Sequence, residues 1–384
     1  MRKITVLWDR TAYTLRWLRA LVWAEEAFYK NGYQIYFYGT PEYKYTLPLE
    51  RETEQETENF LSFITENKLD IVFCAFHDVG FLGKYKQQKQ LLPKLKDHCE
   101  MIVWLDTSDS SGMSSFAVLP YVDIYLKKQL LRDVSEYYFH HYGERVYFQY
   151  YHEQFSAEDG DAQRDVLVPK YRSKIGISWN MGFSDRPYTD DDEHIVELGE
   201  LLTHRCDACV KNRKYDVHYR GSDMIFQRKE LGKLLQNRDD LSHGDIVSKV
   251  SFDEYFSELE NSRTVLSPYG WGEICFRDTD TFAAGAVLIK PDMDHLVTWP
   301  DWYRKGETYI PLAWDFSDFD EVMDYIKKKE NYILLERIAE NGRRLYQKYL
   351  MSEESKDTFV THIISQIENS LNRYGVSAKC NIEM

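Results

Sequence analysis

The stretch from Ser267 to Gly285 carries residue types suited to chemistry on a phosphate group. It contains the end of an apolar strand, a loop with Gly270 and Gly272, and a run that predicts a helix before the next apolar strand. Glycine lets a backbone approach a phosphate closely, and a helix N-terminus offers unpaired N–H groups and a partial positive charge. We therefore expect an anion to bind at this loop. A helix cap with solvated charges is the simpler alternative.

Three charged side chains and one aromatic ring lie in the same stretch. Glu273 and Asp280 are two helical turns apart, so both carboxylates can share one helix face and accept hydroxyls of a ribose or sugar. Arg277 lies one turn from each and can hold them in place or neutralise a phosphate. Trp271, between the two glycines, adds a flat apolar face of the kind that suits sugars.

A second group of polar residues follows the apolar strands of the N-terminal half. Asp106 and Asp109 come after the strand expected at 101–105, and His77 comes after the strand expected at 70–76. In open α/β sheets the carboxyl ends of the strands form the ligand crevice, so we expect these side chains at its rim. Each is a candidate catalytic base for a hydroxyl group, and capping of a turn is the alternative role.

Apolar strands that alternate with helical segments predict parallel sheets covered by helices on both faces. The pattern occurs twice, and a polar, irregular stretch over 156–174 separates the two occurrences. We predict an α/β fold of two Rossmann-like domains, 1–165 and 166–350, whose parallel sheets face a central cleft. Residues 351–384 are expected to form a C-terminal helix that packs back on the N-terminal domain.

The charge of the chain argues against nucleic acid as a partner. Its 384 residues include 48 Lys and Arg against 63 Asp and Glu, a net charge of -15 that repels a polyphosphate over most of the surface. No apolar run reaches the roughly 18 residues of a membrane span, and Asp9 comes too early for a signal peptide. We expect a cytoplasmic protein. Lysines between residues 84 and 96 could meet an anionic membrane, and a solvated helix face is the alternative.

The stretch from Ser262 to Asp318 resembles the donor site of GT-B glycosyltransferases, in which a glycine-containing loop precedes a helix with a carboxylate near its end. Exostosin-like and bacterial surface-polysaccharide enzymes share this arrangement. The resemblance implies transfer of a sugar from a nucleotide-activated donor to a hydroxyl of a glycan or lipid-linked glycan, as in lipopolysaccharide or capsule synthesis. It also implies a reaction without a metal or other cofactor, and peripheral association with the inner membrane.

The resemblance assigns roles to individual residues. Asp280 stands where the family's E-x7-E motif has its second Glu, which binds the nucleotide ribose, and Glu273 lies one position after the place of the first. Gly270 and Gly272 match the loop that passes the donor diphosphate. Arg220 follows a strand of the second domain, where related enzymes place an Arg that stabilises the leaving diphosphate. An exposed turn residue is the alternative for Arg220.

Two other functions fit the same pattern. A nucleotide-sugar epimerase or hydrolase can share the two-domain fold, and it would act on the donor with no acceptor present. A non-catalytic, sugar-nucleotide-binding subunit of a synthase complex would bind the donor without turnover. Neither motif position carries a Glu, since Gly272 and Asp280 stand there, and this leaves room for the third function.

Overall fold

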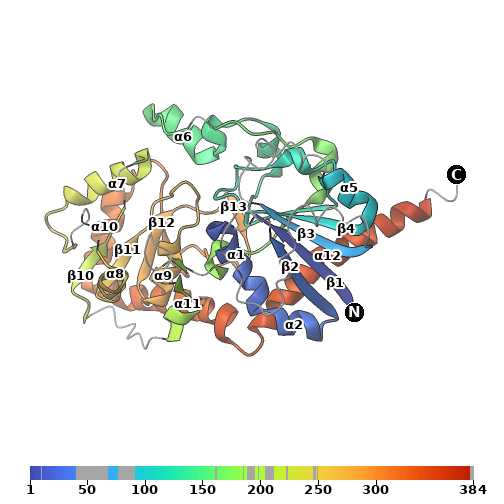
Figure 1. Cartoon of the computed structure of the whole chain (residues 1–384). Helices are drawn as coiled ribbons and strands as arrows, with labels where there is room; N and C mark the ends of the chain where they lie inside the picture. The colour runs from blue at the N-terminus through green and yellow to red at the C-terminus, as the bar shows by residue number, and fades with distance from the viewer. Residues whose placement is uncertain are drawn as a thin grey trace.

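The chain folds into two α/β halves that lie side by side (Figure 1). The computed structural model describes residues 1–9, 11–39, 68–76, 91–160, 162–184, 186–187, 195–197, 199–203, 212–221, 224–244, 248 and 250–380. The first half carries a six-stranded sheet and the second half a four-stranded sheet. Every strand pair within these two sheets is parallel.

The first half is built from apolar strands joined by helices. Its elements are β1 (Arg2–Trp8), α1 (Ala12–Trp23), α2 (Glu25–Lys30), β2 (Tyr33–Gly39), β3 (Leu69–Phe76), α5 (Leu91–His98), β4 (Cys99–Asp106), β5 (Ile124–Lys127), β6 (Gln129–Leu131), α6 (Val146–Phe155) and β7 (Ile175–Ile177). The sheet order is β2-β1-β3-β4-β5-β7. Ile4 of β1 aligns with Ile35 of β2 and Ile71 of β3, and all three are buried. Apolar residues in register across neighbouring strands form the core of this half.

The second half repeats the pattern with shorter strands. Its elements are β10 (Tyr215–His218), α7 (Phe226–Gln236), α8 (Phe252–Glu260), β11 (Ser262–Leu266), α9 (Phe276–Ala283), β12 (Val287–Pro291), β13 (Leu296–Thr298), β14 (Tyr309–Leu312), α10 (Phe319–Lys327), α11 (Tyr332–Met351) and α12 (Ser355–Cys380). The sheet order is β10-β11-β12-β14. Two short strands between the halves, β8 (Arg186–Pro187) and β9 (Ile195–Val196), form an antiparallel pair. The predicted α/β fold class is confirmed, with the arrangement of halves and C-terminal helices that the GT-B resemblance implied.

The first sheet extends past residue 165, where the sequence pattern places the domain boundary. β7 pairs with β5, aligning Ile175 with Tyr125 and Ile177 with Lys127. The segment up to residue 177 therefore belongs to the first half. Sequence reasoning assigned it to the second half because a three-residue strand carries too little periodicity to show which sheet it joins.

Strand pairing, ring stacking and helix packing among the described residues join the two halves. β6, directly after β5 of the first sheet, pairs with β13, which follows β12 of the second sheet. Trp17 of α1 stacks on Trp179 with ring centroids 4.4 Å apart. At the C-terminal end, α11 packs on α9 and β12, and α12 continues to α2 of the first half (Figure 1). The halves are thus joined by a strand pair, a stacked ring pair and a helix.

Phe359 of α12 packs against aromatic rings from both halves. It is fully buried, and its ring lies within 6 Å of Trp23, Trp179 and Trp299, which come from both halves. Phe359→Ala should lower the free energy of unfolding by about 3–5 kcal/mol, because truncation of a buried aromatic leaves a cavity. Phe139→Ala removes the same atoms from a side chain that is 65% exposed and should cost under about 0.5 kcal/mol. Equal losses in denaturant unfolding would contradict the joining role.

Candidate functional site

Two loops meet where the carboxyl edges of the sheets approach each other. The serine loop, residues 107–115, follows β4, and the glycine loop, residues 267–275, follows β11. A Cβ atom added to Gly272 would overlap the backbone carbonyl of Asp109, and the Ser111 N–H donates to the Glu273 carboxylate at 3.0 Å. The two halves therefore touch at the positions where sequence analysis places ligand chemistry.

Glu273 reaches from the second half into the first. Its carboxylate is fully buried and accepts hydrogen bonds from the Ser111 hydroxyl at 2.5 Å, the Ser111 N–H and Gln129 Nε2 at 3.3 Å. No Lys or Arg of the described residues lies within 4 Å of it. The predicted role of Glu273 was to hold sugar hydroxyls, but the structure places these hydrogen bonds at the junction of the halves instead.

Both glycines of the glycine loop pack closely: the neighbour at Gly272 is backbone, which excludes a side chain, and the neighbour at Gly270 is the end of the flexible Arg228 side chain. A Cβ on Gly270 would overlap the guanidinium of Arg228, and a Cβ on Gly272 would overlap the Asp109 carbonyl. The Gly270 N–H donates to the Gly272 carbonyl at 2.9 Å, which closes a tight turn. This N–H is therefore already occupied, and the close approach that the glycines allow in this structure is to protein groups.

Trp271 lies between the glycines with its indole 42% exposed. Its carbonyl accepts from Arg145 Nε at 2.6 Å and from the Tyr147 hydroxyl at 3.0 Å. The Arg145 guanidinium also lies over the indole ring, 5.6 Å from its centroid. The backbone of Trp271 is thus fixed by the first half, which leaves an aromatic face exposed beside the junction.

An arginine cluster lies beside α9, near the end of β10. Arg277 Nη2 donates to the Arg220 carbonyl at 2.5 Å, whereas Arg277 Nη1 is buried and has no hydrogen-bond partner among the described residues. Arg220 itself makes a two-point contact with Glu258, with Nε and Nη2 each 2.7 Å from a carboxylate oxygen. Burial lowers the pKa of His218 to about 4; Glu258 opposes this shift, and Arg277 and Arg220 add to it. Arg277 rather than Arg220 therefore offers an unused N–H donor.

Asp280 is also buried in the second half. Its carboxylate accepts from the Tyr255 hydroxyl of α8 at 3.0 Å. Two positions earlier, Asp278 caps the start of α9 by accepting from the Cys275 N–H at 3.1 Å, and it forms a fully buried ion pair with Lys290 at 3.0 Å. Sequence analysis missed this pair, although an Asp at the third helical position is a capping signal.

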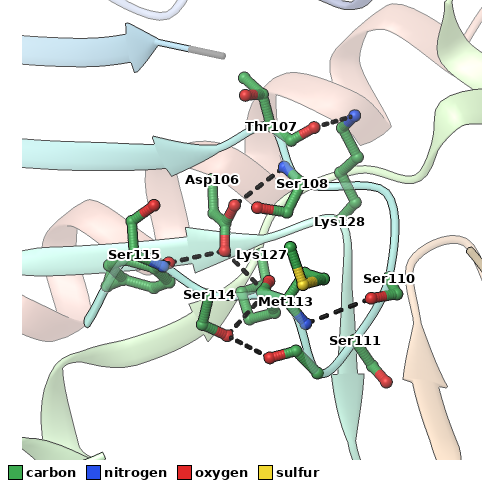
Figure 2. A network of polar contacts seen from close by, with 12 residues as sticks. Asp106, Thr107, Ser108, Ser110, Ser111, Met113, Ser114, Ser115, Lys127 and Lys128 are labelled. Atoms are coloured by element: carbon green, nitrogen blue, oxygen red, sulfur yellow. Dashed lines mark hydrogen bonds and ion pairs between the residues drawn. The ribbon is translucent and has the colours of Figure 1, made fainter. Parts of the chain in front are cut away.

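Asp106 forms a buried ion pair at the start of the serine loop (Figure 2). One of its oxygens accepts from Lys127 Nζ and from the Tyr125 hydroxyl, each at 2.6 Å, and the other accepts from the Ser108 N–H at 2.9 Å. Burial by itself raises the pKa of Asp106, but Lys127 and these hydrogen bonds hold it below its ordinary value. The geometry therefore gives Asp106 a structural role in place of the predicted catalytic one.

Asp109 differs from Asp106 in both exposure and partners. Its carboxylate is half-buried, and one oxygen accepts from the Tyr13 hydroxyl of α1. The other oxygen has no hydrogen-bond partner in the described part of the chain. The Asp109 carbonyl is fixed by Gln129 Nε2 at 2.6 Å and lies against Gly272. Of the predicted catalytic residues, Asp109 is the one placed at the junction; His77 lies outside the described residues.

Two searches of the described ranges bear on cofactors and membranes. No group of three or more His, Cys, Asp or Glu side chains converges there into a metal site. In the same ranges, no helix combines the length and the apolar character that crossing a membrane requires.

No protein-family model matches this chain, and no curated protein sequence matches it. Among solved structures it is similar to an alpha-glucosyltransferase in complex with UDP-glucose and DNA containing an abasic site, at 11% identity and a TM-score of 0.45, over 94% of this chain and 98% of that one. It is similar to sucrose-phosphate synthase from Thermosynechococcus elongatus at 10% identity and a TM-score of 0.45, over 96% and 100% of the two chains.

A third likeness is to MurG from Acinetobacter baumannii, at 8% identity and a TM-score of 0.38, over 95% of this chain and 100% of that one. All three are glycosyltransferases of about the length of this chain.

The contact between Gly272 and the serine loop yields a stability prediction. Gly272→Ala should lower the free energy of unfolding by about 1–3 kcal/mol, because the added methyl group meets backbone that cannot move aside without separating the loops. Gly244→Ala is the matched control, since a Cβ there meets nothing within 4 Å. Denaturant unfolding of both variants checks this, and a Gly272→Ala protein as stable as the control would show that the loops do not pack as described.

Proposed function

We propose that this protein is a glycosyltransferase that moves a sugar from a nucleotide-activated donor to a hydroxyl of a glycan acceptor. The observation that carries the proposal is the position of Asp109. Asp109 lies at the carboxyl edge of the first sheet with its backbone carbonyl against Gly272 of the second half, and one oxygen of its carboxylate accepts from the Tyr13 hydroxyl. A half-buried carboxylate with a free oxygen at such an edge suits a general base.

The donor is proposed to bind on the second half. Arg277 Nη1, which has no partner among the described residues, is the group that would stabilise charge on the leaving diphosphate. The exposed indole of Trp271 provides an apolar face for a sugar or base. Asp280 keeps its proposed role toward the ribose, next to the Tyr255 hydroxyl that it accepts from.

The acceptor is proposed to bind on the first half, where Asp109 takes the proton of the attacking hydroxyl. The acceptor oxygen forms a bond to the anomeric carbon of the donor as the bond from that carbon to the phosphate oxygen breaks. The bonding pair leaves with the nucleoside diphosphate, and the proton remains on Asp109. Direct attack of this kind inverts the anomeric centre.

The biological setting follows from the sequence resemblance over Ser262 to Asp318. We propose a bacterial surface polysaccharide, such as lipopolysaccharide or capsule, as the acceptor, free or linked to a lipid. The reaction is proposed to need no metal ion, since guanidinium groups can stabilise the leaving group. The net charge of -15 supports an acceptor other than nucleic acid. We also propose that the protein is cytoplasmic and contacts the membrane peripherally.

The base assignment predicts different outcomes for two neighbouring carboxylates. Asp109→Asn should reduce kcat by about 10²–10⁴-fold with little change in stability, because it removes the proton acceptor from a half-buried site. Asp106→Asn should instead lower the free energy of unfolding by about 3–5 kcal/mol, because it leaves Lys127 buried without its partner. Transfer assays and denaturant unfolding of both variants check this. Full activity of Asp109→Asn would remove it as the base.

The donor assignment predicts a loss of nucleotide binding. Thermal-shift titration with UDP, GDP and CMP should show at least one ligand that raises Tm, because a ligand that binds only the folded state stabilises it. Arg277→Gln should weaken the binding of that nucleotide by about 1–3 kcal/mol. Arg344→Gln, at a side chain that is 72% exposed, should leave the binding affinity unchanged.

The same assay separates the alternatives. Donor binding without transfer to any glycan would favour the non-catalytic subunit. Free sugar or an epimer formed without an acceptor would favour the hydrolase or epimerase. Loss of transfer in EDTA with recovery in Mn²⁺ would overturn the metal-independent reaction.

A further inference from the structure

Lys128 lies next to the proposed base and is buried, with no ion pair among the described residues. It directly follows β5 and is 4% exposed. Its Nζ donates to the Thr107 carbonyl at 2.8 Å (Figure 2) and to the Tyr13 hydroxyl at 3.0 Å. It also lies 4.4 Å from the ring centroid of Tyr13 and 5.1 Å from that of Trp17. Within the described ranges, no carboxylate lies within 4 Å of this ammonium.

The groups that face Lys128 come from three elements. Asp106 and Asp109 lie at the end of β4 and in the serine loop, Lys127 ends β5, and Tyr13 lies on α1. Burial lowers the pKa of Lys128 to about 8; Asp109 and Asp106 oppose this shift, and Lys127 adds to it. Lys128 can therefore gain or lose its proton near neutral pH while its neighbours stay in place.

The two protonation states of Lys128 place different demands on Tyr13. An ammonium group has three donors and no acceptor, so the Tyr13 oxygen accepts from charged Lys128 and its own proton goes to Asp109. A neutral amine has a lone pair, so it can accept the Tyr13 proton instead. In that state the Asp109 oxygen loses its donor, and the carboxylate is free to turn.

We propose that Lys128 and Tyr13 are positioning residues for transfer: charged Lys128 directs the Tyr13 proton onto one oxygen of Asp109 and so fixes the other oxygen toward the acceptor hydroxyl. This inference rests on the proposed function and deepens it, because it assigns the orientation of the base to two residues outside the predicted site. Asp109 alone takes the proton of the acceptor. Lys128 and Tyr13 act through it and exchange no proton with the substrate.

The proposal fixes the direction of the pH dependence. Lys128 is charged below about pH 8, where the orienting hydrogen bond is present, so kcat should be highest there. As pH rises through this value, Lys128 loses its proton and kcat should fall by about tenfold per pH unit.

The test measures kcat from about pH 6 to pH 10 for the wild-type protein, Lys128→Met and Tyr13→Phe. Met has a similar volume and removes a buried charge, so Lys128→Met should fold. In both variants, kcat below pH 8 should be lower by about tenfold or more. The fall in kcat above pH 8 that the wild-type protein shows should be absent. Lys128→Arg should keep its charge above pH 8, restore part of the rate and extend the plateau upward.

Lys174→Met is the matched control. Lys174 is also partly buried in the first half, donates to the Leu119 and Val122 carbonyls, and lies 5.1 Å from the ring centroid of Tyr171. It directly precedes β7, and its loss should leave the fall in kcat near pH 8 in place. A control variant that lost the limb would show that general destabilisation, and not Lys128, sets the profile, and would overturn the inference.

The outcomes separate this inference from the proposed function. A falling limb that persists in Lys128→Met or Tyr13→Phe, with transfer activity intact, overturns the positioning role alone. A wild-type protein that binds nucleotides and transfers no sugar overturns the proposed function, and the positioning role with it. Limbs that disappear in both variants and move upward in Lys128→Arg support both.

Discussion

The buried carboxylate of Glu273 is the interaction on which the junction of the two halves depends. A carboxylate removed from water is stable only when its oxygens are hydrogen-bonded, and here the donors come from Ser111 and Gln129 of the other half. Separating the serine and glycine loops would leave the buried Glu273 carboxylate without donors, and the free-energy cost of this keeps the loops together. Gly272 allows this contact because any side chain there would overlap the Asp109 carbonyl.

Each of the two loops is also anchored by a buried ion pair at the carboxyl end of its sheet. Asp106 pairs with Lys127 in the first half, and Asp278 pairs with Lys290 in the second. Removing one partner of such a pair is strongly destabilising, whereas the intact pair adds little net stability. The pairs therefore fix the geometry of the loops more than they stabilise the fold, and they leave other side chains to meet a ligand.

A carboxylate oxygen on one half and an arginine N–H on the other have no hydrogen-bond partner among the described residues. On the first half Asp109 keeps one oxygen without a partner in the described residues, and on the second half Arg277 keeps one buried N–H in the same condition. Arg220, by contrast, is held by Glu258. The proposed function uses Asp109 as the base on one half and Arg277 as the cation that stabilises the leaving group on the other.

The sequence by itself determined the α/β class, the two parallel sheets and the strand ends where polar residues gather, because these follow from apolar periodicity along short stretches. Tertiary structure alone decided which of these polar residues have hydrogen-bond or ion-pair partners within the protein. Ser111 and Glu273 are separated by 162 residues, and no local spacing predicts that they meet. The same holds for the contrast between Asp106 and Asp109, three positions apart: one meets Lys127 from the next strand and the other meets Tyr13 from α1. Long-range partners, which sequence periodicity does not encode, set the burial and hydrogen bonding of each carboxylate.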